Sequence, residues 1–285
     1  LVELSSAKDY CKQHIVLHYT AVLLGRDAVV CPIGYVGKDE PGEGLVRQME
    51  EAGMDVQFVG QSMTDSTMIS ICLQYPDKEG CNFTAENNAS AHVTPTYIIR
   101  CMEEIGIDAR TIVAAVPEVS VESRMAMLAY GKKKGAYCVL SVPVSEAGQF
   151  EKEGAFAHCD LLAVNEEEAG AILGEEQKGR ALAEALWKKL ARVNPDINIA
   201  ITCGKEGAYI VCNSKVERVP PLKGHAVNTT GAGDAFLGGT LAGIAFGFPL
   251  QKGREDKEFG DTLLGSAAEL GTICAGMAVE SKDSI

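Results

Sequence analysis

A carboxylate directly after a Gly-Ala-Gly turn is the feature of this sequence with the clearest chemical use. Residues 228–234 read Asn-Thr-Thr-Gly-Ala-Gly-Asp, and a stretch of small apolar residues that predicts a helix follows up to Phe246. The first N–H groups of a helix have no partner within it, and the peptide dipoles place about half a positive charge there. Such an end binds phosphate readily. The pattern predicts a site where main-chain amides meet an anion and Asp234 activates a hydroxyl group.

The two glycines make this turn unusual. Gly231 and Gly233 are free to take a positive φ and let a ligand approach the main chain, whereas a β-branched residue would block both. An acidic residue near a helix start is also common for structural reasons, because it interacts favourably with the helix dipole. The Gly-x-Gly spacing alone leaves the functional and the structural interpretation of Asp234 open.

Four segments together resemble the ribokinase/PfkB family of carbohydrate kinases, in the family's order and over nearly the whole chain. Residues 228–234 resemble its signature, and this resemblance favours the functional interpretation of Asp234. The other three are a glycine pattern at residues 33–39 with Gly42, an Asn-x-x-Glu segment at Asn165 and Glu168, and a Thr-x-Gly-x-x-Gly loop at Thr202, Gly204 and Gly207.

The resemblance implies an ATP-dependent phosphotransferase that phosphorylates an alcohol (hydroxymethyl) group of a sugar or sugar-like substrate. Asp234 would take the proton of the acceptor alcohol as general base. Gly231, Ala232 and Gly233 would donate main-chain N–H groups to the γ-phosphoryl oxygens. The chain has no Walker-type lysine motif, and this chemistry requires none.

The resemblance also implies a nucleotide and a metal site. Asn165 and Glu168 would order Mg²⁺ and its waters at the ATP phosphates. The alternative is that they form only a capping box, the reciprocal pair of hydrogen bonds that starts a helix. The expected nucleotide contacts are Thr202, Gly204, Gly207 and Thr229. An ordinary turn between two strands is the alternative for residues 204–207.

Two departures from the family pattern limit what the resemblance assigns. The early Asp and the Gly-Gly-Asn pattern of sugar recognition are not seen near residues 11–16, so the substrate-binding residues stay unassigned. Because the chain begins with Leu1, we expect that residues including lid strands precede it. Asn228 stands where the family more often has an Asp that helps to hold K⁺, and a neutral amide attracts a cation less strongly, so K⁺ dependence is left open.

Composition bounds the class of protein. The chain of 285 residues, 46% hydrophobic, suits a single domain over residues 1–285. Its net charge of −13 argues against nucleic-acid and membrane partners. No apolar run of about 18 residues and no signal-peptide pattern occur, so we expect a cytoplasmic protein. The sequence leaves open whether it forms a homodimer.

Cysteines and histidines give weaker signals. The ten cysteines show no Cys-x-x-Cys spacing, and five of them lie in apolar runs, so we interpret these as buried, reduced thiols: Cys72, Cys138, Cys203, Cys212 and Cys274. His14 and His18 are four apart and would share a helix face, but without an acidic motif residue between them we do not assign a metal site.

Alternating strands and helices must position these residues. The pattern predicts βαβ units, and the family resemblance implies a ribokinase-like α/β sandwich: a central, mainly parallel sheet flanked by helices, with a small β lid from N-terminal segments that is incomplete in this chain. Predicted strands are 28–33, 111–116, 136–142, 161–164 and 197–202. Predicted helices include 42–52, which Asp39 caps, 119–134, 166–173 and 178–193. Hairpins are predicted at 67–75 with 81–85 and at 208–212 with 215–219.

Ligands of open α/β sheets bind beyond the carboxyl ends of the strands. Asn165 and Thr202 end two predicted strands, so they are expected to meet Asp234 in one crevice. A nucleoside kinase of the same fold is the close alternative, and a non-catalytic ligand-binding regulator is another, against which the presence of Asp234 argues. A dinucleotide site is disfavoured, because Phe236 stands where a third small residue is needed.

Overall fold

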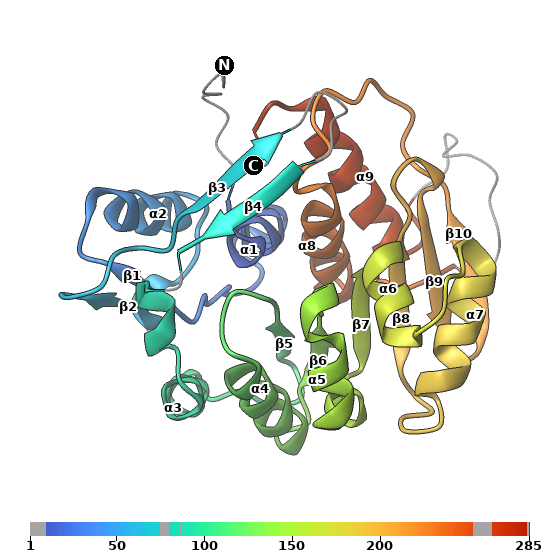
Figure 1. Cartoon of the computed structure of the whole chain (residues 1–285), viewed down its shortest axis with the longest axis horizontal. Helices are drawn as coiled ribbons and strands as arrows, with labels where there is room; N and C mark the ends of the chain where they lie inside the picture. The colour runs from blue at the N-terminus through green and yellow to red at the C-terminus, as the bar shows by residue number, and fades with distance from the viewer. Residues whose placement is uncertain (1–9, 75–79, 86, 253–263, 284) are drawn as a thin grey trace.

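A six-stranded sheet forms the centre of the molecule (Figure 1). The computed structural model describes residues 10–74, 80–85, 87–252, 264–283 and 285. The strand order is β10-β9-β8-β7-β6-β5; β5 to β8 run parallel, and β9 and β10 add an antiparallel hairpin at one edge. The strands are β5 (Ile112–Ala115), β6 (Tyr137–Leu140), β7 (Leu161–Asn165), β8 (Asn198–Thr202), β9 (Ala208–Cys212) and β10 (Lys215–Val219). The predicted central, mainly parallel sheet is confirmed.

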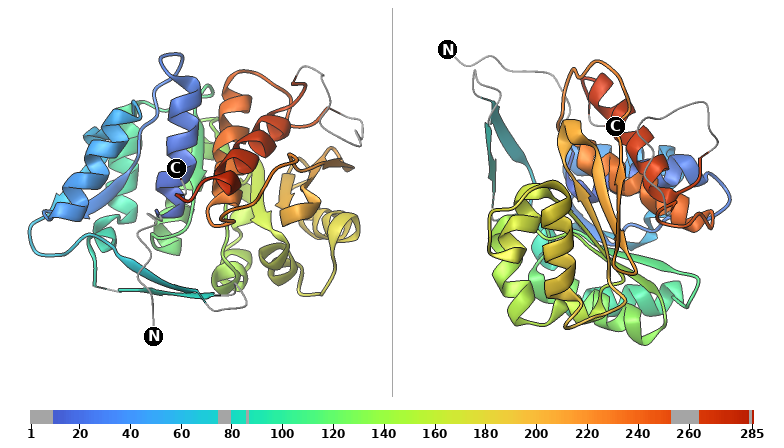
Figure 2. Two further views of the ribbon diagram at one scale, coloured as in Figure 1. Left: turned by 90° about the horizontal axis from the view of Figure 1, so that it is seen from above. Right: turned by 90° about the vertical axis from the view of Figure 1, so that its right-hand side faces the viewer.

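Helices cover both faces of this sheet, as Figure 2 shows in its right-hand view. One face carries α1 (Lys12–Leu24), α8 (Ala232–Ala245) and α9 (Ala267–Glu280). The other carries α4 (Val121–Lys133), α5 (Ala147–Lys152), α6 (Glu166–Leu173) and α7 (Gly179–Leu190), with α3 (Pro95–Ile105) packed beside α4. None of the described helices combines the length and the hydrophobicity that a membrane span requires.

Side chains of the parallel strands alternate between the two helical layers. In β7, Leu162 and Val164 pack into the core under α4 to α7, whereas Leu161 and Ala163 pack into the core under α8. Successive residues of a strand point to opposite faces, so a strand covered on both sides is apolar throughout. This explains why β7 appears in the sequence as an unbroken apolar run.

Glycines let α8 and α9 approach closely and thereby fix the helix that carries Asp234. A Cβ at Gly239 would lie 2.6 Å from Cys274 Sγ and 2.9 Å from the Cα of Gly271. We expect Gly239→Ala to lower the free energy of unfolding by about 1 to 3 kcal/mol, the usual cost of overpacking. Thermal unfolding measures this. Gly148→Ala is the control, because no atom lies within 4 Å of its Cβ position; an equal loss there would contradict the packing explanation.

Two smaller strand pairs lie on the N-terminal side. β1 (Gly34–Gly37) pairs with β2 (Val59–Ser62) in parallel, and Asp39 caps α2 (Glu40–Glu51) by accepting a hydrogen bond from Gly42 N at 2.9 Å, as predicted. β3 (Ser70–Gln74) and β4 (Gly80–Thr84) form the predicted antiparallel hairpin. Both views of Figure 2 show it standing away from the helical layers. Residues 75–79, which include the end of the predicted first strand and most of the predicted turn, lie outside the described part of the chain.

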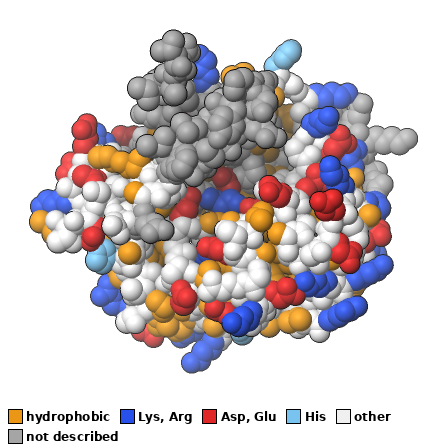
Figure 3. Space-filling view, in the orientation of Figure 1, with side chains coloured by type: hydrophobic (Ala, Val, Ile, Leu, Met, Phe, Trp, Pro, Cys, Tyr) orange, Lys and Arg blue, Asp and Glu red, His pale blue; other side chains and the backbone are white. Residues whose placement is uncertain are grey.

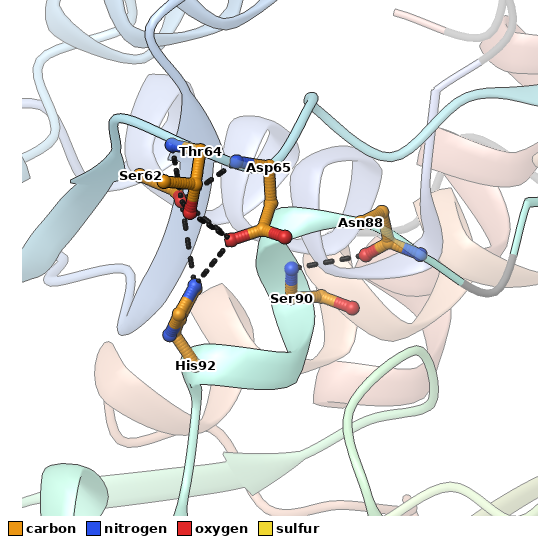
Figure 4. A network of polar contacts seen from close by, with 6 residues as sticks. All are labelled: Ser62, Thr64, Asp65, Asn88, Ser90 and His92. Carbon is orange, nitrogen blue, oxygen red and sulfur yellow. Dashed lines mark hydrogen bonds and ion pairs between the residues drawn. The ribbon is translucent and has the colours of Figure 1, made fainter.

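A polar network joins the two ends of this hairpin to β2 (Figure 4). The Asp65 carboxylate lies 2.8 Å from His92 Nε2 and accepts a hydrogen bond from Ser62 Oγ at 2.8 Å. Asn88 Oδ1 accepts from Ser90 N at 2.9 Å and caps the short helix η2 (Ala89–His92). The contact with His92 is the main reason why the pKa of Asp65 falls to about 2. The segments before β3 and after β4 are thus held together by ionic and polar contacts.

One predicted strand is wrong. Residues 28–33 contain no strand, and β1 begins only at Gly34. Within the described ranges no strand pairs with this segment; instead, the carbonyl group of Val30 accepts from Asp55 N at 2.9 Å and that of Ile33 from Gln13 Nε2 at 3.1 Å. Val30 and Ile33 are buried nonetheless. The segment is buried at Val30 and Ile33 but exposed at Val29, and it lacks the neighbouring strand whose backbone hydrogen bonds a β-strand needs.

The other predicted elements are confirmed, with ends shifted by three residues or fewer. The helix predicted at 166–173 and the hairpin at 208–212 and 215–219 have the bounds of α6, β9 and β10. Of the cysteines predicted to be buried, Cys138, Cys203 and Cys274 are buried and carry free thiols. Burial of Cys212 was predicted wrongly, because this free thiol at the end of β9 is only partly buried, and the side chain of Cys72 lies outside the described part of the structure. His14 is buried, and its ring stacks on that of His18 at 6.4 Å between centroids.

Candidate active site

A pocket of about 220 Å³ lies where α1, α6 and α8 meet the ends of β7 and β8. In the orientation of Figure 1, Figure 3 shows a hollow near the middle of this face where acidic and basic side chains meet. The pocket is lined by Lys12, Ser141, Ala163, Val164, Asn165, Glu168, Ala200, Thr202, Gly233, Asp234, Phe236 and Leu237. The structure thus brings together five residues that the sequence singled out: Asn165, Glu168, Thr202, Gly233 and Asp234.

The local sequence explains how Asp234 reaches this pocket. Gly231 is the N-cap of α8 and has φ 78°, a left-handed conformation that favours glycine. Ala232 begins the helix, so Asp234 lies in its first turn. Gly233 is helical and its φ is not positive, so only Gly231 uses the conformational freedom that the sequence offered at both positions. The first turn of α8 therefore presents its N–H groups and a carboxylate to the same space.

Burial controls the charge of Asp234. The pKa of this carboxyl group is raised to about 7, mainly by burial; the ammonium of Lys12 acts to lower it, and the carboxylates of Glu118 and Glu168 act to raise it. Lys12 Nζ lies 3.6 Å from Asp234 Oδ1. A general base works best when its pKa is close to the working pH. At neutral pH, Asp234 is therefore present in both its protonated and its deprotonated form.

Asn165 and Glu168 form the complete capping box at the start of α6. Asn165 Oδ1 accepts from Glu168 N at 2.8 Å, and Glu168 Oε2 accepts from Asn165 N at 2.8 Å. The structural interpretation of this pair is therefore correct. It does not use all of the carboxylate, because Glu168 Oε1 lies 3.7 Å from Lys12 Nζ on the side of the pocket. The same glutamate starts a helix and offers one oxygen to a ligand.

The Thr-x-Gly-x-x-Gly loop reaches the pocket only through its first residue. Thr202 ends β8 and lines the pocket, whereas Gly204 and Gly207 bound the short helix η5 (Gly204–Glu206) and do not line it. A Cβ at Gly207, whose φ is 91°, would lie 2.1 Å from the carbonyl oxygen of Val219. Glycine is thus required there by packing alone. Contact of Gly204 and Gly207 with a nucleotide stays a prediction.

The head of the α8 signature lies outside the pocket. Thr229 is exposed, and its carbonyl group accepts from Ala232 N at 3.4 Å, so it shapes the turn before α8. Asn228 donates from Nδ2 to the carbonyl oxygen of Lys282 at 3.1 Å and accepts from Thr230 N at 3.0 Å. Both amide atoms of Asn228 therefore have protein partners. The nucleotide contact of Thr229 also stays a prediction.

Three polar residues of the site were missed by sequence reasoning. Lys12 and Ser141 line the pocket, with Lys12 Nζ donating to Ser141 Oγ at 3.1 Å. Glu118 has φ 84°, an unusual conformation for a residue with a side chain, and burial raises its pKa. Glu118 follows the predicted strand 111–116, so the carboxyl-end rule, applied to every predicted strand, singles it out. Ser141 follows β6 in the structure but lies inside the predicted strand 136–142, so the rule does not single it out. No comparable signal exists for Lys12.

Comparison with known proteins gives one family over most of the chain. The family model described as pfkB family carbohydrate kinase matches residues 19–285. A ribokinase of Schizosaccharomyces pombe is 26% identical over 236 residues, which are 80% of this chain and 71% of that protein. A deoxyribokinase of Salmonella typhi is 26% identical over 71% of this chain and 64% of its own length. The chain thus spans about two thirds of the length of these relatives.

Solved structures show the same fold at low identity. The structure of ribokinase from Giardia lamblia matches with a TM-score of 0.77 and 20% identity, covering 96% of this chain and 84% of that one. Fructokinase from Vibrio cholerae O395, solved with fructose, ADP and a calcium ion bound, matches with a TM-score of 0.73 and 18% identity, covering 96% and 86%. The fold is the ribokinase-like α/β sandwich that the sequence predicted.

Proposed function

Because this chain belongs to the pfkB family of carbohydrate kinases, we propose that it transfers the γ-phosphoryl group of ATP to a hydroxymethyl group of a sugar or sugar-like molecule. The observation that carries this proposal is the position of Asp234. Its carboxylate lies in the first turn of α8, behind the left-handed Gly231, and shares one pocket with Asn165 and Glu168. A base and an anion-binding helix end are the two groups that phosphoryl transfer to an alcohol requires.

Asp234 accepts the proton of the acceptor hydroxyl group as that oxygen attacks phosphorus. The main-chain N–H groups of Gly231, Ala232 and Gly233 stabilise the negative charge that develops on the phosphoryl oxygens. The first N–H groups of a helix have no acceptor within it. That of Ala232 makes a long contact of 3.4 Å to the Thr229 carbonyl oxygen before the helix, which it would exchange for a phosphoryl oxygen. Burial of the carboxylate supports the proposal, since it brings the pKa of Asp234 to about 7.

The residues on the α6 side fit a magnesium ion. Mg²⁺ binds oxygen ligands and keeps several of its waters, and Glu168 has Oε1 left over from the capping box. Asn165 and Glu168 would hold the ion's waters at the ATP phosphates, where bound Mg²⁺ neutralises phosphate charge. We place the nucleotide along Thr202, with Gly204, Gly207 and Thr229 as further contacts. K⁺ dependence and the formation of a homodimer stay open questions, and a cytoplasmic location stays a prediction.

Release of ADP with a panel of acceptors tests the function. The panel contains sugars, sugar acids, polyols and nucleosides, with Mg²⁺ present and K⁺ varied. We expect turnover with a sugar or polyol that has a free hydroxymethyl group. Turnover with nucleosides alone would instead identify a nucleoside kinase of the same fold. Binding of ATP without turnover of any acceptor would favour a regulator and contradict the proposal.

The activity is expected to rise with pH across neutrality. Only the deprotonated Asp234 accepts a proton, and its pKa is raised to about 7. kcat/KM for the acceptor should therefore increase about tenfold for each pH unit below this value and level off above it. A pH–rate profile between about pH 5 and 9 measures the effect. A profile that is flat through pH 7 would remove Asp234 as the titrating base.

A further inference from the structure

Lys12 occupies the space between the two carboxylates of the candidate active site. Its Nζ atom lies 3.6 Å from Asp234 Oδ1 and 3.7 Å from Glu168 Oε1. Glu168 belongs to the side on which we place the nucleotide and its metal ion, and Asp234 to the side of the acceptor alcohol. A phosphoryl group that passes from one to the other must pass the ammonium group of Lys12.

The position of this ammonium group is fixed by the fold. Lys12 is the first residue of α1, and its main-chain N–H donates to Glu118 Oε1 at 3.1 Å. The side chain is 22% exposed and donates from Nζ to Ser141 Oγ at 3.1 Å. Glu118 and Ser141 follow the carboxyl ends of β5 and β6, where sheets of this kind bind ligands. Lys12 is thus tied at both its main chain and its tip, unlike a solvated surface lysine.

The charges of the pocket residues favour a cation between Asp234 and Glu168. Among the residues that line the pocket, Lys12 is the one basic side chain, and it faces Asp234 and Glu168. At about 4 Å and an effective dielectric constant near 20, two unit charges interact with about 4 kcal/mol. Without Lys12, two carboxylates would repel an incoming phosphate by amounts of this order. Neither carboxylate lies within the 2.7–2.9 Å of Nζ that is typical of tight ionic hydrogen bonds. The ammonium is therefore held at the pocket by its hydrogen bond to Ser141 but can turn from the carboxylates toward a phosphoryl oxygen.

We propose that Lys12 is a catalytic residue whose ammonium group leaves the two carboxylates and binds the γ-phosphoryl oxygens of ATP during transfer. This rests on the proposed function. The bond from phosphorus to the bridging oxygen of ADP breaks, and its electron pair leaves with ADP. The acceptor oxygen forms the new bond to phosphorus, its proton passes to Asp234, and Lys12 keeps its own protons. Before transfer, the same ammonium favours the ionised form of Asp234, because it lowers the pKa that burial raises.

Four variants test this role. Lys12→Met and Lys12→Gln remove the charge, and the amide of the second can still donate to Ser141. Lys12→Arg keeps the charge, and Lys215→Met removes an exposed lysine of β10 as the control. We expect both neutral variants to lose about 10- to 100-fold in kcat. Lys12→Arg should keep a larger fraction of the parental kcat than the neutral variants, and the kcat of Lys215→Met should equal that of the parent.

Two readouts separate this role from a structural one. Calorimetry with MgATP and MgADP, without acceptor, should show about a tenfold loss of ATP affinity in the neutral variants and little change for ADP, which has no γ-phosphoryl group. The acidic limb of kcat/KM should move to higher pH, because Asp234 loses the cation that favours its ionised form. The role of Lys12 would be overturned if the neutral variants kept the parental ratio of ATP to ADP affinity and the parental pH position of the acidic limb of kcat/KM.

Failure of this inference is distinguishable from failure of the proposed function. The nucleotide measurement needs no turnover, so it tests Lys12 even where the parent protein phosphorylates none of the acceptors. If the parent turns over a sugar while its neutral variants keep both the parental ratio of ATP to ADP affinity and the parental acidic limb, the inference alone is contradicted. A parent that binds neither nucleotide would contradict the proposed function. Lys12→Gln provides the neutral variant if Lys12→Met unfolds.

Discussion

Asp234→Asn is expected to lower turnover by two to four orders of magnitude and to leave the affinity for MgATP nearly unchanged. The reason is that asparagine has the shape of aspartate but cannot accept the proton of the acceptor alcohol, a contribution of about 10²- to 10⁴-fold. In the proposed arrangement the nucleotide meets the main chain of α8 and the α6 side of the pocket, which the substitution leaves in place. Steady-state kinetics and nucleotide calorimetry on the same preparation measure the two effects. Equal turnover in variant and parent would remove Asp234 from the mechanism.

The stability of the same variant provides the control. Because the pKa of Asp234 is raised from 3.8 to about 7, the folded protein holds a proton that the unfolded chain releases. The contribution of this group to stability is therefore full below pH 3.8 and is lost as pH rises through about 7. Asparagine stays neutral, so we expect Asp234→Asn to melt several degrees higher than the parent at pH 8; each kcal/mol is worth about 2 to 4 °C in chains near this size. A variant that is both inactive and less stable would indicate a structural role.

Loss of activity together with a gain in stability is the signature of a group kept for function. Burying an ionised carboxylate costs free energy unless it is paired, and in the described structure Lys12 approaches Asp234 only to 3.6 Å. The fold thus carries an incompletely paired carboxylate. Proteins accept such costs mainly where chemistry requires them. The electrostatics of the pocket therefore support a catalytic role of Asp234 without reference to any relative.

The parts of the fold that the sequence predicted are those fixed by local chemistry. The hairpin of β9 and β10 follows from the turn residues Asn213 and Ser214, both of which take a positive φ. α6 begins directly after its N-cap residue Asn165, because the capping box between Asn165 and Glu168 satisfies N–H groups at the start of the helix. In each case the partners lie within a few residues of one another. The bounds of these elements could therefore be predicted to the residue.

The parts that could not be predicted depend on partners far along the chain. Residues 28–33 have the apolar pattern of a strand, but a strand also needs a neighbour in the sheet. Lys12 and Asp234 are 222 positions apart, and only the packing of α1 beside α8 brings them together. Short motifs contain no information on such pairs. The motif residues of the site were therefore predictable, whereas Lys12, the basic residue between the two carboxylates, was not.

Gly233→Ala is expected to lower kcat/KM by about 10- to 100-fold without destabilising the protein. Gly233 is helical, and a Cβ there would lie 3.7 Å from Thr202 Oγ1, an ordinary contact. Alanine in a helix is more stable than glycine by about 0.5 to 1 kcal/mol, so folding should be unharmed or improved. The methyl group would nevertheless project toward the pocket, where the phosphoryl group must approach the N–H groups of the first turn of α8.

This substitution separates the two interpretations of the glycine turn. If Gly233 serves only the geometry of α8, alanine should be tolerated in both stability and activity. If the turn binds the transferred group, activity falls while the melting temperature holds, because the methyl group keeps the phosphoryl oxygens away from the N–H groups that stabilise their developing charge. Gly148→Ala, in an open position of α5, controls for a general effect of the added methyl group. Parental activity of Gly233→Ala would place the phosphoryl group elsewhere and would leave Asp234 without a reason to lie at this helix end.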